Sequence, residues 1–306
     1  MVFPFGKSYR GPLADLTQEE RSCCGRMKAD VQMFSETIGE RNTLCYENLL
    51  SSQAFIECRF RVLGYDVRIE QYEADGGLVA NIEAEKRGLK FPEEILLVGA
   101  HYDSSPGSPG ADDNSTGVAA LLELARAYKD VEIDRTLRFV AFVNEEPPFF
   151  LTELMGSRVY VQGVKAREEK LLGMICFDSL GYYSSIHDSQ QYPSPLERFY
   201  PDTGDFIAFV SNPQSALFLE KCIRTFRKTT KFPSEALIAP NSIQEAGFSD
   251  HSSFWKEGYH AIMVTNTAFF RNRHYHLPSD TTATIDFERM TRVVLGIGKV
   301  LGNLTC

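Results

Sequence analysis

The sequence lacks the features that would place the chain in a membrane or mark it for export. No apolar run approaches the roughly 18 residues of a membrane-spanning helix, and residues 1–6 lack the basic and apolar regions of a signal peptide. Its seven cysteines are odd in number, and Cys23 and Cys24 are adjacent, which does not fit a disulfide framework. We therefore expect a cytoplasmic protein with no membrane span, and export after removal of a signal is the alternative.

An excess of basic residues is also absent. The formal net charge is -9, which argues against nucleic acid as the main partner because phosphates attract positively charged surfaces. Part of the acidic surplus can be internal, since carboxylates that surround a divalent cation count as negative charge. The sequence carries no indication of the oligomeric state.

No internal repeat, low-complexity tract or composition shift divides the chain, so we expect one domain over residues 1–306. Residues 1–16 are predicted to form an extended N-terminal arm. Residues 184–204 are rich in Ser, Tyr, Pro and Asp and predict an irregular loop excursion. A functional loop and a tolerated surface insertion both fit that segment.

Strand-like and helix-like segments alternate along the sequence. Apolar or alternating runs predict strands, and amphipathic runs predict helices. The expected strands are 66–72, 78–84, 95–101, 136–143, 172–177, 206–210 and 261–265, and the expected helices are 16–38, 47–63, 115–128, 214–227 and one capped by Asp286. This alternation predicts an α/β fold with a central mixed, mostly parallel sheet and helices on both faces.

Residues 96–127 organise the rest of the chain. The apolar run 95–100 has the length of a buried strand and places His101 at its carboxyl end, where open α/β sheets carry their chemistry. Residues 104–110 contain two prolines and two glycines and predict a loop. Asn114 is a good N-cap for the helix that follows. A solvated turn beside a capped helix is the alternative interpretation.

Polar side chains that can bind metals follow four of the predicted strands. They are His101 and Asp103, then Glu145 and Glu146, then Asp178, and finally His274, His276 and Asp280. Carboxyl ends of neighbouring parallel strands share one edge of a sheet, so these groups can converge. Histidine and carboxylate without cysteine suit Zn²⁺ or another first-row divalent ion. Each residue alone has a structural explanation, but their shared placement favours a metal site.

Five motifs in this order resemble those of the co-catalytic di-zinc exopeptidases typified by bacterial aminopeptidase S, which are related to glutamate carboxypeptidases and glutaminyl cyclases. The motifs are His101-Tyr102-Asp103-Ser104, Gly110-Ala111-Asp112-Asp113-Asn114-Ser115-Thr116-Gly117, Asn144-Glu145-Glu146, Phe177-Asp178 and Tyr275-His276-Leu277-Pro278-Ser279-Asp280-Thr281. The resemblance covers about residues 78–306. It implies a zinc exopeptidase fold.

The resemblance also implies two zinc ions per chain. Asp113 would bridge the two ions. His101 and Asp178 would complete one metal site, and Glu146 and His276 would complete the other. Two metals about 3.5–4 Å apart lower the pKa of a shared water and polarise a scissile carbonyl.

Two further residues receive catalytic roles from the resemblance. Glu145 would be the general base that takes a proton from water and passes it to the leaving amine. Asp103 would accept a hydrogen bond from the His101 ring and fix its tautomer. The resemblance also places a cis peptide before the bridging aspartate, at the Asp112–Asp113 bond.

The remaining histidines are not expected to bind metal. Residues 249–252 are predicted to support the site, with His251 and His274 outside the ligand set, and His187 and His260 are ordinary surface or core residues. Two features depart from the commoner family pattern. They are the run 147–150, Pro-Pro-Phe-Phe, and Asn266, and both are expected to line the substrate pocket.

The leading functional prediction is a zinc aminopeptidase that acts on peptide substrates. A glutaminyl-cyclase-like acyltransferase with one zinc is a second hypothesis. A carboxypeptidase variant needs cationic groups for a substrate carboxylate, and Arg158, Arg271 and Arg273 are candidates. A non-catalytic domain of the same fold is least favoured, because all five ligand positions and the base are present.

Overall fold

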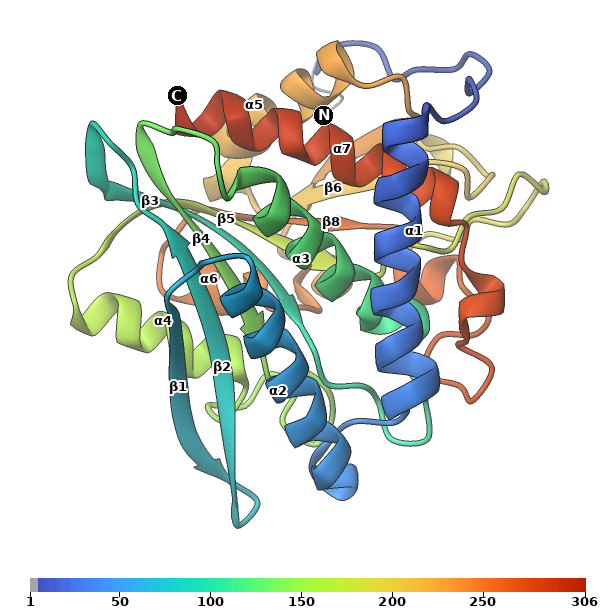
Figure 1. The fold of residues 1–306 in the computed structure, drawn as a ribbon. Helices are drawn as coiled ribbons and strands as arrows, with labels where there is room; N and C mark the ends of the chain where they lie inside the picture. The colour runs from blue at the N-terminus through green and yellow to red at the C-terminus, as the bar shows by residue number, and fades with distance from the viewer. Residues whose placement is uncertain (1–4) are drawn as a thin grey trace.

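A sheet of eight strands runs through the centre of the computed structural model, which describes residues 5–306 (Figure 1). The strands are β1 Val67–Ala74, β2 Gly77–Lys86, β3 Phe91–His101, β4 Arg135–Phe142, β5 Lys170–Asp178, β6 Ile207–Ser211, β7 Ser234–Ile238 and β8 Ala261–Thr265. Their order in the sheet is β1-β2-β4-β3-β5-β8-β6-β7. The four central strands β4, β3, β5 and β8 pair in parallel, whereas β1–β2, β2–β4 and β6–β8 pair antiparallel. The predicted α/β class with a mixed, mostly parallel sheet is confirmed.

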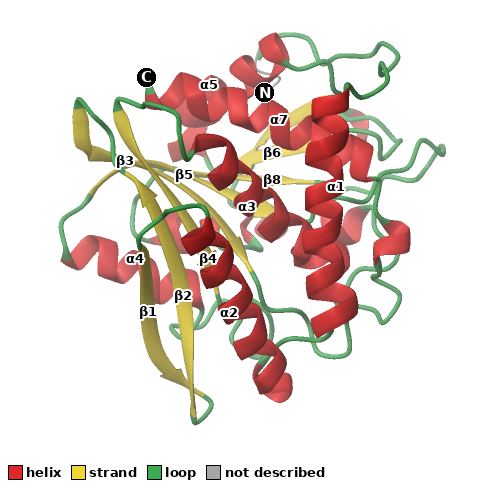
Figure 2. Ribbon diagram, viewed as in Figure 1, coloured by secondary structure: helices red, strands yellow, loops and turns green. Residues whose placement is uncertain are grey.

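Helices cover both faces of this sheet (Figure 2). They are α1 Gln18–Gln32, α2 Tyr46–Val62, α3 Gly117–Tyr128, α4 Gly156–Ala166, α5 Ala216–Thr229, α6 His251–Lys256 and α7 Phe287–Thr305. One apolar core lies between the sheet and α1, α2, α3, α5 and α7, and a smaller core lies beneath α4 and α6. Side chains of β3 alternate between the two cores, as expected of a strand buried on both faces: Leu96 and Val98 face the larger one and Leu97 the smaller one.

Most element boundaries agree with the sequence prediction. Thr17 caps α1 through a reciprocal pair with Glu20, and Gly39 and Gly64 follow the first two helical regions with φ of +87° and +88°. Helices α4 and α6 and strand β7 are not predicted from the sequence. The six residues of α6 are too few to show a helical period, and β7 is a half-buried edge strand with no continuous apolar run.

The described part of the N-terminal arm, residues 5–16, contains no helix or strand and contacts β7. Ser8 Oγ accepts a hydrogen bond from the backbone N–H of Ser234 at 2.9 Å, and Arg10 pairs with Glu235 at 2.6 Å. These contacts hold the arm against the edge of the sheet.

Residues 184–204 are irregular apart from one short turn of helix, Leu196–Arg198. Gln190 fixes this excursion to the segment after β8. Its amide donates to Thr267 Oγ1 at 2.9 Å, and its carbonyl oxygen accepts from Arg271 Nε at 2.8 Å. The excursion therefore borders the same edge of the sheet as the end of β8.

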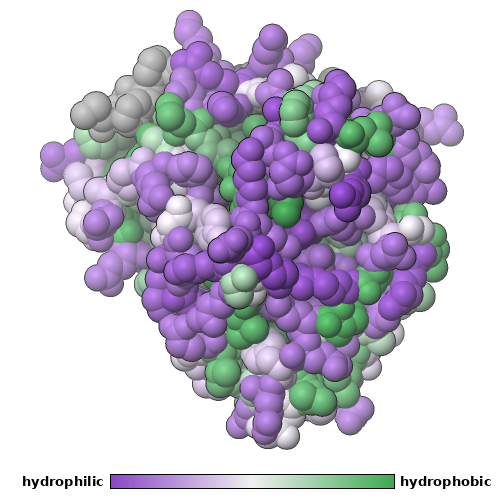
Figure 3. Space-filling view, turned by 90° about the vertical axis from the view of Figure 1, so that its left-hand side faces the viewer, coloured by the Kyte–Doolittle hydropathy of each residue, from purple (hydrophilic) through white to green (hydrophobic). Residues whose placement is uncertain are grey.

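Within residues 5–306, no helix is both long and apolar enough to cross a membrane. The face of the molecule drawn in Figure 3 is mostly hydrophilic, and its hydrophobic residues form small separate groups. All seven cysteines are free thiols.

Candidate metal centre

The predicted site residues meet at the carboxyl edge of the central strands. His101 and Asp178 are the last residues of β3 and β5, and Glu145 and Glu146 follow the end of β4. His276 lies in the loop between β8 and α7. Parallel pairing of the central strands brings these ends together, as the sequence predicts.

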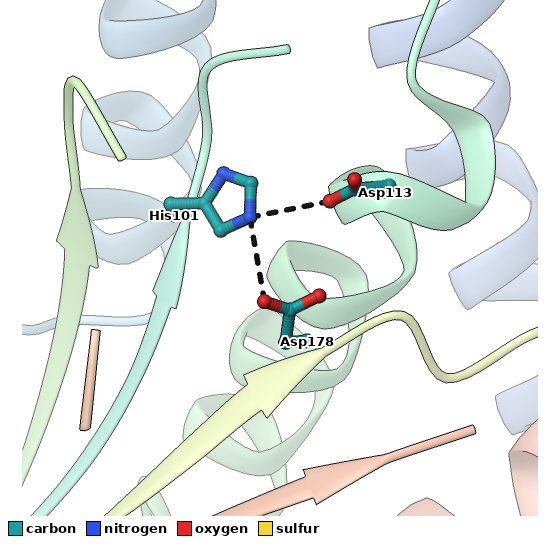
Figure 4. Close-up of side chains that lie close together, drawn as sticks. All are labelled: His101, Asp113 and Asp178. Atoms are coloured by element: carbon teal, nitrogen blue, oxygen red, sulfur yellow. Dashed lines mark ion pairs between the residues drawn. The ribbon is translucent and has the colours of Figure 1, made fainter. Parts of the chain in front are cut away.

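One group of three side chains contains His101, Asp113 and Asp178. His101 Nε2 lies 3.3 Å from Asp113 Oδ1 and 3.9 Å from Asp178 Oδ2 (Figure 4). All three side chains point toward one another, and His101 is fully buried. Neither ring nitrogen of His101 makes a hydrogen bond.

A second group contains Asp113, Glu146 and His276. His276 Nε2 lies 3.1 Å from Asp113 Oδ2 and 3.1 Å from Glu146 Oε2. This nitrogen and Glu146 Oε1 are buried without a hydrogen-bond partner. Asp113 therefore belongs to both groups and turns a different oxygen toward each histidine.

These distances fit a divalent metal at each group. Tetrahedral zinc bonds its nitrogen and oxygen ligands at about 2.0–2.2 Å, which places neighbouring ligand atoms about 3.3 Å apart. The observed separations within the two groups are 3.1 to 3.9 Å. A buried imidazole nitrogen that faces carboxylates without forming a hydrogen bond to them has a lone pair available to a metal ion. The residues present fit zinc.

The electrostatics of the site also favour cations. Burial raises the pKa of Glu146 to about 7 and that of Asp178 to about 6, with Asp113 contributing to both shifts. Burial alone lowers the pKa of His276, but the nearby carboxylates of Asp113 and Glu146 stabilise its protonated form and raise the pKa to about 10. The centre thus concentrates negative charge in a desolvated place, and a divalent ion offsets that charge.

Glu145 lies beside both groups and belongs to neither. Its Oε2 is 3.8 Å from His101 Nε2, and the side chain is buried. Burial raises the pKa of Glu145 well above its usual range, and the negative charges of Glu146 and Asp178 add to that rise.

Asp103 contacts more of the site than the sequence analysis expected. Its Oδ1 lies 3.5 Å from His101 Nδ1, outside hydrogen-bond geometry. Its two oxygens instead accept hydrogen bonds from the backbone N–H groups of Glu145 at 3.1 Å and Glu146 at 3.0 Å. Asp103 therefore fixes the backbone that carries both glutamates.

The turn around Asp113 corrects one expectation. The cis peptide joins Asp113 to Asn114, and the bond between Asp112 and Asp113 is trans. With that arrangement the backbone N–H groups of Asp112 and Asp113 both donate to the carboxylate of Asp280. Asn114 lies three residues before α3, and its Oδ1 accepts from the N–H of Gly117, the first residue of α3, at 3.1 Å, whereas Thr116 occupies the N-cap position itself.

Sequence analysis missed Arg41, which is fully buried beneath the site. Its guanidinium donates to the carbonyl oxygens of Tyr102 at 2.7 Å, Pro109 at 2.6 Å and Gly110 at 2.9 Å. Gly110 has a φ of +57°, and a Cβ there would lie 2.5 Å from the Asp113 carbonyl oxygen, so the loop requires glycine. Because Arg41 binds backbone oxygens, no pattern of side chains in the sequence marks it.

The other histidines lie outside the two metal groups, as expected. His251 is buried and its Nε2 is 2.8 Å from the Ala246 carbonyl oxygen, while His274 Nδ1 is 2.9 Å from Ser279 Oγ. His260 is exposed. His187 lies in an exposed group with two aspartates.

Two expectations about the pocket and its cations need revision. Asn266 is buried and donates to Asp112 Oδ2 at 2.7 Å, so its side chain supports the turn. Neither Asn266 nor residues 147–150 line the apolar pocket that Asp178 and Tyr275 help to form. Arg158 is buried and paired with Glu257 at 3.0 Å. Arg271 is buried and donates to Gln190 and to the Phe206 carbonyl oxygen. Both arginines are buried and engaged by other groups of the protein, whereas Arg273 is exposed and donates to the ring of its neighbour His274 at 3.4 Å.

Two adjacent groups of histidine and carboxylate at the carboxyl edge of a mostly parallel sheet supply the ligands that a metal centre requires. The model of the family described as Peptidase family M28 matches residues 78–301. The chain belongs to this family, and the predicted class of zinc-dependent metallo-exopeptidase is confirmed.

Individual relatives share the sequence or the fold of this chain. The Escherichia coli protein named Uncharacterized protein YfbL is 35% identical over 287 residues, which are 91% of this chain and 87% of that protein. The solved structure of BSAP, a zinc aminopeptidase from Bacillus subtilis, superimposes with a TM-score of 0.74 at 16% identity and covers 92% of this chain and 95% of its own. A glutaminyl cyclase from Bacteroides thetaiotaomicron gives a TM-score of 0.69 at 16% identity, over 92% and 97% of the two chains. At these identities the structural likeness concerns the fold, which peptidase and cyclase share.

Proposed function

We propose that this chain is an aminopeptidase that holds two zinc ions and releases N-terminal residues from peptides. The observation that carries the proposal is the position of Asp113. Its Oδ1 and Oδ2 face His101 and His276 at 3.3 and 3.1 Å, and each histidine has a further carboxylate beside it. A carboxylate shared in this way suits a bridge between two metals.

The two groups supply the metal ligands in this proposal. His101, Asp113 and Asp178 hold one zinc, and Asp113, Glu146 and His276 hold the other. When bound, the zinc pair supplies Lewis acidity that activates water and polarises the scissile carbonyl.

Glu145 is the general base. It is buried beside the ligands without belonging to either metal group, so it is free to take a proton from the attacking water and pass it to the leaving amine. Burial and neighbouring negative charge raise its pKa, which makes it a better proton acceptor near neutral pH. Asp103 is a positioning residue, since its hydrogen bonds to two backbone N–H groups set where Glu145 stands.

The charge of the site favours the amino end of a peptide. The ligand carboxylates are neutralised once the metals are bound, and Glu145, which belongs to neither metal group, is a buried carboxylate left to face a cationic α-amine. Of the three arginines that could bind the carboxylate of a carboxypeptidase substrate, Arg158 and Arg271 are bound to other groups of the protein. The third, Arg273, is exposed and donates to His274. The name of the Bacillus subtilis structure, a zinc aminopeptidase, agrees with this choice.

A glutaminyl-cyclase-like acyltransferase is the second candidate, because a cyclase shares the fold. Its nucleophile is the amine of the substrate itself, so it needs one metal and no activated water. The number of zinc ions per chain therefore separates the two functions.

The deciding experiment measures zinc stoichiometry by mass spectrometry together with activity on three substrate types: aminoacyl amides, peptides with N-terminal glutamine and peptides with C-terminal glutamate. We expect two zinc ions, hydrolysis of aminoacyl amides, and about one zinc with lost hydrolysis in Asp178→Ala. Asp130→Ala, at an exposed position after α3 and outside every candidate metal group, is the matched control and keeps two zinc ions. One zinc in the wild type, with cyclisation of N-terminal glutamine, would overturn the proposal.

A further inference from the structure

A mainly apolar pocket opens beside the candidate metal centre. Asp178, a member of one metal group, is among the residues that line the pocket. Val210 of β6 and Met263 and Thr265 of β8 contribute to its lining from the sheet. A side chain attached next to a carbonyl at the metal centre is therefore placed to enter this pocket.

Apolar and aromatic residues from three loop segments make up most of the remaining wall. They are Pro193 and Leu196 of the excursion, Ile243, Ala246 and Phe248 before α6, and Phe269, Phe270 and Tyr275 after β8. The rings form a connected group: Phe269 lies 4.3 Å from Phe270 and 5.6 Å from Tyr275, centroid to centroid. Aromatic faces attract cations as well as apolar groups.

Glu245 interrupts this apolar wall. Apart from Asp178, it is the one charged residue among the described residues that line the pocket. Its side chain is half-buried, and across residues 5–306 its carboxylate forms neither an ion pair nor a hydrogen bond. The pocket thus holds an acidic group and no cation.

We propose that this pocket receives the side chain of a substrate's N-terminal lysine or arginine, with Glu245 as its counter-ion. The inference rests on the proposed aminopeptidase function, which places the scissile carbonyl beside Asp178. The apolar wall contacts the methylene stem of the side chain. Glu245 and the aromatic rings bind the ammonium or guanidinium.

The cost of desolvation supports a basic side chain over an apolar one. An apolar side chain that fills the pocket removes water from the Glu245 carboxylate without replacing it. A cationic side chain restores a partner to that carboxylate. The pocket therefore discriminates between side chains of equal length by their charge.

The first test compares kcat/KM of the zinc-loaded protein on the lysyl and norleucyl amides of one fluorogenic amine, since norleucine has the same stem without the charge. We expect at least about a tenfold preference for lysine. Glu245→Gln should lower lysyl turnover about tenfold and leave norleucyl turnover within about twofold. Glu132→Gln removes the same charge from an exposed turn before β4 and should change neither. Equal or faster norleucyl turnover, unaltered by Glu245→Gln, overturns the inference.

A second test measures binding without turnover. Calorimetry compares lysine amide and norleucine amide on the wild type, Glu245→Gln and Glu245→Asp, with thermal unfolding as a check that each variant folds. We expect tighter binding of lysine amide, lost in Glu245→Gln and partly kept in Glu245→Asp. If no amide is hydrolysed but this pattern of binding holds, the aminopeptidase function fails and the pocket assignment stands. Hydrolysis with no preference for lysine in either test overturns the pocket assignment alone.

Discussion

Asp280 Oδ1 accepts a hydrogen bond from the backbone N–H of Asp112 at 2.9 Å, although 168 positions separate the two residues. The other oxygen of Asp280 accepts from the N–H of Asp113 at 3.2 Å. Asp280 lies four residues after His276 in the same loop. One carboxylate therefore ties the turn that presents Asp113 to the loop that presents His276.

Asp280→Ala should weaken both the fold and the metal centre. The substitution leaves two buried N–H groups without acceptors, at a cost of about 1–3 kcal/mol each. Loss of an outer partner of this kind lowers metal affinity by about 10–100-fold. Chemical denaturation in chelator and zinc titration measure the two effects separately. Asp280→Asn keeps one acceptor, so its stability and zinc affinity should lie between those of the wild type and Asp280→Ala. Unchanged zinc affinity in Asp280→Ala would contradict the anchoring role of Asp280.

Glu145→Gln should separate catalysis from metal binding. Glutamine keeps the shape of the side chain but cannot accept the proton, so we expect kcat to fall by roughly 10²–10⁴-fold while zinc content stays near two per chain. Glu146→Gln is the matched comparison and should lose zinc. If the two variants show the opposite pattern, the roles of base and ligand are reversed.

Replacing Arg41 should loosen the loop between β3 and α3. Arg41→Met leaves buried carbonyl oxygens of Tyr102, Pro109 and Gly110 without donors, and we expect a loss of about 3 kcal/mol of unfolding free energy. Arg41→Lys keeps the charge but not the forked geometry, so it should recover less than half of that loss. Faster amide hydrogen exchange at residues 104–110 would locate the change. Wild-type stability in Arg41→Met would contradict this prediction.

His251 should make the protein sensitive to acid. Burial lowers its pKa from 6.5 to about 4, so the unfolded chain binds a proton below pH 6.5 that the folded chain does not yet bind. The contribution of neutral His251 to the unfolding free energy is fully present above pH 6.5. As the pH falls toward 4, up to about 3 kcal/mol of that free energy is lost. Unfolding free energies of the wild type and His251→Gln, measured from pH 7 to 4, test this prediction. The exposed His260→Gln is the control, and an equal pH slope in wild type and His251→Gln would refute it.

Much of the fold and of the constellation at the metal centre was predictable because it depends on local signals. The buried strands β3, β4 and β5 are apolar runs of strand length, and polar residues stand directly at their ends. Parallel pairing of these strands is then enough to predict that His101, Glu146 and Asp178 lie together.

The supporting contacts were not predictable in the same way. Arg41 and Asp280 act on backbone groups distant in sequence, and such contacts impose no period or spacing on side chains. Asn266 was expected to line a pocket, but its side chain faces Asp112. The direction of that side chain depends on how the loop after β8 packs.

The spread of the site along the chain has a consequence for how the protein is made. His101 and His276 lie on opposite sides of β5 and β8 in sequence, and Asp113 needs both to complete its two groups. A growing chain that has extended only as far as β5 has one half of this arrangement. The strand β8, which pairs with β5, and the loop bearing His276 are still missing. Only a chain that has been synthesised as far as His276 therefore carries both histidines of the metal centre.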